Sequence, residues 1–125
     1  MRGSMKDLPK TTDMNQIVMH EADWGEMHVE FDTVRKKLDV APLLKGLPDD
    51  RCQCPHWGYV LKGRMTLKYK DHEEIVNAGD AYYIAPGHTG IFDAGTEVVE
   101  FSPKDKLKKT MEVIMHNLKA AQQKK

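Results

Sequence analysis

Short β-type segments separated by closely spaced turn sequences constrain the fold of this chain more than any other feature. Residues 65–70 (MTLKYK) alternate apolar and polar side chains, which is the pattern of a strand with one buried face. Residues 81–85 (AYYIA) are apolar on both sides, as expected for a strand inside a closed sheet. Similar segments are separated by turn sequences at Gly63-Arg64, Lys70-Asp71-His72, Asn77-Ala78-Gly79, Pro86-Gly87 and Ala94-Gly95. This spacing is typical of a sandwich or barrel, so we predict a mainly β fold over residues 16–102.

The first fifty residues give weaker signals. Residues 1–4 (MRGS) are typical of an expression leader and are left out of the fold prediction. Residues 5–15 are polar, and we expect them to be loose. Residues 33–50 have helical spacing that Pro42 and Gly46 interrupt, which predicts an irregular connection with at most one short helix.

Two short strands are predicted between these segments, at residues 16–20 and 26–31. The second strand alternates well: Met27, Val29 and Phe31 share one face, while His28 and Glu30 share the other. We therefore expect His28 to be a surface residue.

The C-terminal segment has the signals of an amphipathic helix over residues 103–123. Ser102 is a favourable N-cap residue, and Pro103 suits the first helical position. Apolar residues recur at spacings of four and three and form one stripe, which consists of Leu107, Met111, Ile114, Leu118 and Ala121. The stripe predicts packing against the barrel, and the same stripe could pair with its copy in a homodimer.

Composition limits the classes of function. A chain of 125 residues suits one domain with one core. Its 19 basic and 19 acidic residues balance, so the total charge gives no reason to expect a nucleic-acid partner. No apolar run approaches the length of a membrane span, and the first fifteen residues lack the apolar core of a signal peptide. We therefore expect a cytoplasmic protein that binds neither nucleic acid nor membrane.

The strongest chemical signal is a group of thiols and imidazoles. Cys52, Cys54 and His56 occupy every second position, so their side chains would share one face of an extended backbone, and His88 follows in a Pro-Gly turn. Together they form a ligand set for a divalent transition metal, with zinc or iron as the leading candidates. On a straight strand Cys52 and His56 would be roughly 13 Å apart, but Pro55 breaks the ladder and lets His56 start a new strand. Each of these residues alone could also be buried for packing.

The region from Asp49 to Pro103 resembles the cupin family. Gly63 matches the closing glycine of the first cupin motif, with His56 in the position of the family's glutamate and Cys52 and Asp50 in its two histidine positions. Gly79 and Gly87 match glycines of the second motif, whereas Ala85 and Gly90 stand where proline and histidine are usual. The resemblance implies a double-stranded β-helix, the cupin-type jelly-roll barrel, and an inward-facing metal site.

Two classes of function follow from these observations. The protein could be a metalloenzyme of the oxygenase, isomerase or lyase type that acts on a small molecule. It could also be a non-catalytic module that binds or senses a small ligand, with a structural metal or none. Four protein ligands indicate a structural site, because a catalytic metal keeps one coordination position open. Aromatic residues that we expect to line the pocket are Trp57, Tyr59, Tyr82 and Phe92.

Overall fold

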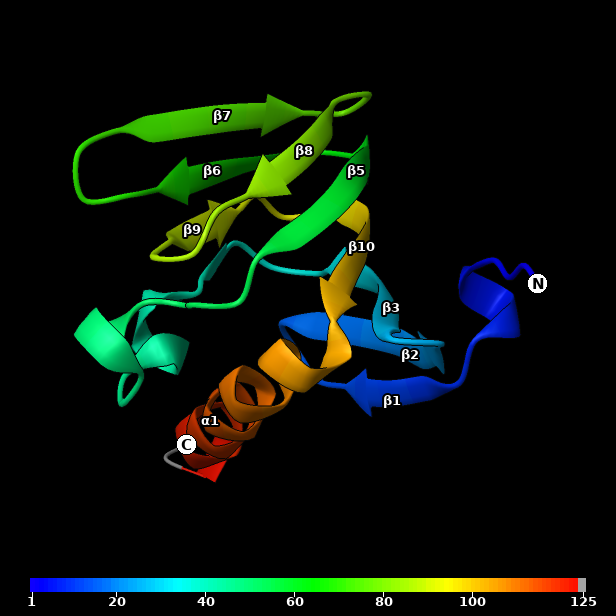
Figure 1. Ribbon diagram of the computed structural model, residues 1–125, viewed down its shortest axis with the longest axis horizontal. Helices are drawn as coiled ribbons and strands as arrows, with labels where there is room; N and C mark the ends of the chain where they lie inside the picture. Colours follow the sequence, from blue (N-terminus) through cyan, green and yellow to red (C-terminus); the bar gives the residue numbers. More distant parts are fainter. Residues whose placement is uncertain (124–125) are drawn as a thin grey trace.

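Two antiparallel sheets pack face to face, with one long helix across one end (Figure 1). The computed structural model describes residues 1–123. Within them the sheet order is β1-β2-β3-β10-β5-β8 in the larger sheet and β4-β9-β6-β7 in the smaller one. The strands are β1 (Lys10–Asp13), β2 (Ile17–Trp24), β3 (Met27–Val34), β4 (Leu38–Asp39), β5 (His56–Lys62), β6 (Arg64–Lys68), β7 (Glu73–Asn77), β8 (Ala81–Ile84), β9 (Thr89–Phe92) and β10 (Glu97–Pro103). The helix is α1 (Lys104–Gln123). This architecture confirms the predicted mainly β fold with a C-terminal helix.

The region before β5 is more ordered than the sequence suggests. The segment at residues 5–15 was expected to be loose, but it contains the short 3-10 helix η1 (Met5–Asp7) and the strand β1. β1 pairs with β2, and that backbone pairing orders a polar segment whose side chains give no strand signal. The connection at residues 33–50 contains β4 and two 3-10 helices, η2 (Ala41–Leu44) and η3 (Pro48–Asp50), so it is irregular as expected, with one more helical turn than predicted.

The polar face of β3 points into the molecule. Glu30 is 4% exposed and Asp32 is 7% exposed, and both line a cavity between the sheets. His28 lies on the same face, and its side chain is 16% exposed, so this histidine, expected at the surface, is half-buried. The alternation of residues along a strand shows which side chains share a face. It does not show which of the two faces points inward, and in β3 that face is the polar one.

Two clusters of buried residues form the core. The first lies between the sheets, and its buried members are Val60, Met65, Leu67, Val76, Tyr82, Ile84 and Val98. The second lies where α1 meets the segment before β5, and its buried members are Leu44, Leu47, Cys52, Cys54 and Leu107.

The apolar stripe of α1 is used within the chain. Leu107 and Leu118 are buried, and Met111, Ile114 and Leu118 line the cavity. Asn117 anchors the helix to the connection, because its amide donates to the backbone carbonyls of Leu43 at 2.7 Å and Lys45 at 3.0 Å. The stripe thus packs against the barrel as predicted, and Ala121 lies at its far end, where it is exposed.

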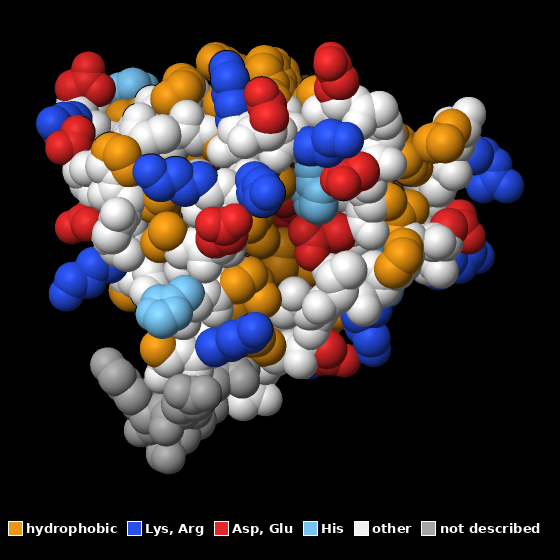
Figure 2. Space-filling model, turned by 60° about the horizontal axis from the view of Figure 1, so that its bottom comes forward, with side chains coloured by type: hydrophobic (Ala, Val, Ile, Leu, Met, Phe, Trp, Pro, Cys, Tyr) orange, Lys and Arg blue, Asp and Glu red, His pale blue; other side chains and the backbone are white. Residues whose placement is uncertain are grey.

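Charges of both signs are mixed over the surface shown in Figure 2, where a hollow with hydrophobic side chains is flanked by acidic side chains and a histidine. In the part of the chain that the structure covers, no helix is both long enough and apolar enough to cross a membrane.

Leu118→Ala tests the role of the stripe. Leu118 is 3% exposed, so its truncation should lower the free energy of unfolding by about 2–5 kcal/mol. Denaturant unfolding would measure the change, with Lys119→Ala as the control because Lys119 is exposed on the next position of the helix. Equal stability of the two variants would contradict this packing.

Candidate metal centre and its cavity

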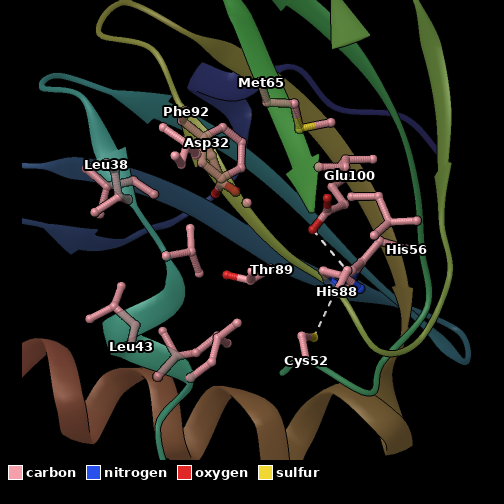
Figure 3. Close-up of a pocket in the computed structure, with 18 of the residues that line it drawn as sticks. Asp32, Leu38, Leu43, Cys52, His56, Met65, His88, Thr89, Phe92 and Glu100 are labelled. Carbon is pink, nitrogen blue, oxygen red and sulfur yellow. Dashed lines mark hydrogen bonds and ion pairs between the residues drawn. The ribbon is translucent and has the colours of Figure 1, made fainter. Parts of the chain in front are cut away.

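Three of the four predicted ligands meet at one place. Cys52, His56 and His88 are all buried, and each offers one ligand atom within 4.8 Å of the others. Figure 3 shows the three side chains together at one end of the cavity. A cluster of one thiol and two imidazoles has the chemistry of a site for zinc, iron or copper.

Backbone pairing brings the ligands together. The Cys52 N–H donates to the His88 carbonyl at 2.9 Å, and the Gly87 N–H donates to the Cys52 carbonyl at 2.8 Å. Beyond Cys52 the chain bends at Cys54, and β5 begins at His56, directly after Pro55. The bend turns His56 back, so that its Nε2 lies 3.4 Å from the Cys52 sulfur.

Cys54 is not part of the cluster. It is 1% exposed, belongs to the core beneath α1, and its thiol donates to the Pro55 carbonyl at 3.3 Å. The expectation that Cys52, Cys54 and His56 share one face assumed an extended backbone. The bend at Cys54 removes that alternation, so the structure places this thiol in the core.

Hydrogen bonds orient both imidazoles. His88 Nδ1 donates to the Ala85 carbonyl at 2.7 Å, which leaves Nε2 as the unprotonated nitrogen of a neutral ring. His56 Nδ1 lies 2.6 Å from the Ser102 hydroxyl and 3.4 Å from Glu100 Oε2. A metal-binding histidine commonly has such a partner on its other nitrogen. The sequence analysis did not identify Ser102 or Glu100 in this role.

Burial shifts the pKa values of two members of the cluster, His88 and Cys52. It lowers the pKa of His88 to about 4, which keeps that imidazole neutral at neutral pH. It also raises the pKa of the Cys52 thiol to about 11, so without a metal the sulfur stays protonated. A metal would have to displace that proton, whereas the neutral His88 imidazole has no proton to lose from Nε2. The donor set and its hydrogen-bond partners therefore fit a divalent transition metal.

A largely apolar cavity of about 130 Å³ adjoins the cluster. Strands of both sheets form its walls, and η2 and α1 close one end. Apolar residues labelled in Figure 3 include Leu38, Leu43, Met65 and Phe92. Of the aromatic residues expected to line the pocket, only Phe92 does so. Trp57, Tyr59 and Tyr82 do not: Trp57 is 44% exposed and Tyr59 is 42% exposed, because both lie on the other face of β5 from His56.

Three carboxyl groups line the same cavity: Glu30, Asp32 and Glu100. Burial raises the pKa of Glu30 well above its usual value and that of Asp32 to about 7, with further contributions from the neighbouring carboxylates. Glu100 accepts a hydrogen bond from the Tyr82 hydroxyl at 2.8 Å. No sequence signal separated these acids from ordinary surface residues.

A second group of possible ligands is already paired. Glu21, His28 and Glu30 lie close together, but His28 Nε2 contacts Glu21 Oε2 at 2.7 Å and its Nδ1 contacts Asp23 Oδ1 at 2.9 Å. The hydrogen bond to Glu21 raises the pKa of His28. This group forms an ion-pair network with both imidazole nitrogens engaged.

Comparison with known proteins shows the fold. No family model matches the sequence, and no curated protein matches it. Among solved structures, a protein of unknown function from Rhizobium leguminosarum bv. viciae 3841 aligns with a TM-score of 0.60 and 12% identity, covering 82% of this chain and 94% of that chain. An RmlC-like cupin from Shewanella frigidimarina NCIMB 400 aligns with a TM-score of 0.55 and 14% identity, covering 81% and 88%.

A third structure is Fe(II)-HppE with the alternative substrate (S)-1-HPP, which aligns with a TM-score of 0.54 and 13% identity. The alignment covers 82% of this chain and 59% of that chain, so this protein corresponds to little more than half of HppE. These similarities confirm the cupin fold that the sequence resemblance implied.

Asp32→Asn tests the protonation of the buried carboxyl. The folded-state pKa of Asp32 is about 7, while that of an unfolded Asp is about 3.9. Its contribution to stability is therefore fully present below about pH 4 and is lost as the pH rises toward 7. We expect the free energy of unfolding of the parent to fall across this window, and the fall to be smaller in the variant by on the order of 2 kcal/mol.

Chemical denaturation at several pH values would measure this difference. Asp39→Asn makes the same change at an exposed position and should keep the profile of the parent. Glu30 and His28 also titrate near Asp32, so the comparison with the parent, and not the profile alone, isolates Asp32. Identical profiles for Asp32→Asn and the parent would contradict the raised pKa.

Proposed function

We propose that the cavity holds one divalent transition metal, zinc or iron, through Cys52, His56 and His88. The convergence of one thiol and two oriented imidazoles at the end of a cavity supports this proposal. Ser102 and Glu100 hold His56, and the Ala85 carbonyl holds His88, so the ligands are positioned before a metal binds.

The number of ligands favours an enzyme. Three protein ligands leave a coordination position open, and all three residues line the cavity, so a small molecule in the cavity would lie next to that position. We propose a metalloenzyme of the oxygenase, isomerase or lyase type that acts on a small molecule. A metal in such a site would supply Lewis-acid or redox chemistry to the bound molecule. HppE, which has the same fold, is described as an Fe(II) protein bound to an alternative substrate.

The residues of the chain have defined tasks in this proposal. His56 and His88 bind the metal as neutral imidazoles, and Cys52 binds it after losing a proton. The apolar walls exclude water, which strengthens electrostatic interactions inside the cavity. Asp32, with a pKa near neutral, can take up or release a proton at a bound ligand.

A second candidate is a metal-free module that binds or senses a small ligand. The cluster has internal contacts that require no metal, since His56 Nε2 lies 3.4 Å from the Cys52 sulfur and His88 is bonded to Ala85. In this alternative the cavity binds an organic ligand alone. The two candidates differ in metal content, which can be measured directly.

Elemental analysis of protein purified without a metal-affinity step, under reduced and anaerobic conditions, tests the proposal. We expect about one metal per chain in the parent and a sharp loss in His56→Ala, His88→Ala and Cys52→Ser, because each removes a ligand. Cys54→Ser is the matched control: it makes the same change two residues away and should keep the metal. Circular dichroism of each variant would check that the fold is retained.

The possible outcomes separate the two candidates. A parent without metal would overturn the metal centre and favour the metal-free module. Full metal content in all three ligand variants would show that the metal binds elsewhere. Loss of metal in Cys54→Ser with the fold intact would restore the four-ligand site expected from the sequence.

A further inference from the structure

The cavity contains two buried polar atoms that lack a partner. Asp32 Oδ1 and Thr89 Oγ1 have no hydrogen-bond partner among the described residues, and both residues line the cavity. Asp32 comes from β3 of the larger sheet, and Thr89 comes from β9 of the smaller one (Figure 3). Unsatisfied buried polar atoms are rare in folded proteins and call for an explanation. A ligand that donates hydrogen bonds to both atoms would provide one.

The charged residues that line the cavity indicate what kind of hydrogen-bond donor the ligand should carry. Its described lining includes Glu30, Asp32 and Glu100, but none of the lining residues is Lys or Arg. Asp32 is 7% exposed and lies two positions from Glu30 on the same face of β3. His28 Nε2 lies 4.0 Å from Glu30 Oε1, but that nitrogen already contacts Glu21 at 2.7 Å, and Asp32 Oδ1 has no hydrogen-bond partner among the described residues. A buried carboxyl oxygen in this position favours a donor that brings positive charge.

We propose that Asp32 and Thr89 form a recognition subsite for the ammonium group of a small aliphatic amine, whose carbon chain lies against Met65, Leu38 and Phe92. The inference rests on the proposed function, since it assigns a substrate class to the cavity beside the metal centre. Thr89 Oγ1 accepts one hydrogen bond from the ammonium group, and Asp32 Oδ1 accepts another that is strengthened by charge.

A metal at the centre does not satisfy these two atoms. Cys52, His56 and His88 would hold it, and neither Asp32 nor Thr89 belongs to that cluster. A monoamine supplies one positive charge, whereas an alcohol supplies none and a carboxylate adds a negative charge.

The size of the cavity limits the ligand to a few carbon atoms. Its volume of about 130 Å³ is close to that of an engineered apolar cavity of about 150 Å³ that binds benzene. Butylamine, with one amine and four carbons, is therefore a suitable probe. 1-Butanol and butyrate have the same carbon chain and differ in the charge of the polar end.

The experiment titrates these three probes into metal-free and zinc-loaded protein and follows binding by two-dimensional NMR. We expect butylamine to bind about tenfold more tightly than 1-butanol in the parent, because its hydrogen bond to Asp32 is charge-assisted. Butyrate should bind more weakly than either. Asp32→Asn should weaken butylamine about tenfold and change 1-butanol by no more than about threefold.

Two further variants make the result specific. Thr89→Val keeps the shape of the side chain but removes the hydroxyl, so it should weaken both butylamine and 1-butanol by about threefold or more. Asp71→Asn makes the same acid-to-amide change at an exposed turn and should leave all three affinities unchanged. Equal binding of butylamine by the parent and Asp32→Asn, or equal binding of butylamine and 1-butanol by the parent, would overturn the subsite.

Metal analysis of the same samples separates the two proposals. A parent that binds zinc but shows no preference for butylamine would overturn the amine subsite and leave the metal centre. A parent that prefers butylamine but binds no metal would overturn the metal centre and support the subsite. Asp32→Asn and Thr89→Val should both keep the metal, because neither residue is one of the proposed ligands.

Discussion

The candidate site depends on the backbone pairing of Cys52 with His88. Two short hydrogen bonds, from Cys52 to His88 and from Gly87 to Cys52, tie the segment before β5 to the turn before β9. Since β5 belongs to the larger sheet and β9 to the smaller one, this pairing also joins the two sheets at the end of the cavity. The thiol and the imidazoles are thus fixed by the same contacts that close the barrel, so the cluster is a consequence of the fold.

Polar residues on the inward faces of two strands form another part of the cavity lining. In the paired strands β3 and β10, Glu30 stands opposite Glu100, and both side chains point into the space between the sheets. Burial in an apolar environment disfavours the charged form, which raises the pKa of Glu30 and Asp32. Members of both hydrophobic clusters line the same cavity as these polar residues. The fold therefore has separate hydrophobic cores and a central space available for a ligand.

The sequence predicted the architecture better than the site. Turn sequences and alternating strands were sufficient to predict a β barrel, and the apolar stripe was sufficient to predict that α1 packs against it. Both signals are local in the sequence. His56 and His88 could be selected because, with the two cysteines, they form a metal-ligand set, and because His56 matches a ligand position of the first cupin motif while His88 lies close to one of the second. Cys54 could not be separated from Cys52, since the spacing of residues does not reveal the backbone bend at Cys54. Glu30 and Asp32 could not be found, because alternation does not reveal which face of a strand points inward.

Acids and histidines gather at two places in this protein, around His28 and around the cavity. The two groups differ in whether their buried polar atoms have partners. Around His28 both imidazole nitrogens contact carboxylates, so the group joins the neighbouring strands β2 and β3 without any ligand. Around the cavity, Asp32 Oδ1 and Thr89 Oγ1 are buried but have no hydrogen-bond partner within residues 1–123. An apolar side chain at position 32 would avoid the cost of burying a carboxyl group. The neighbouring Glu30 carboxyl is a hydrogen-bond partner of Asp32, but it leaves Oδ1 without one among the described residues. A ligand in the cavity that donates to Oδ1 would explain why this carboxyl group is buried.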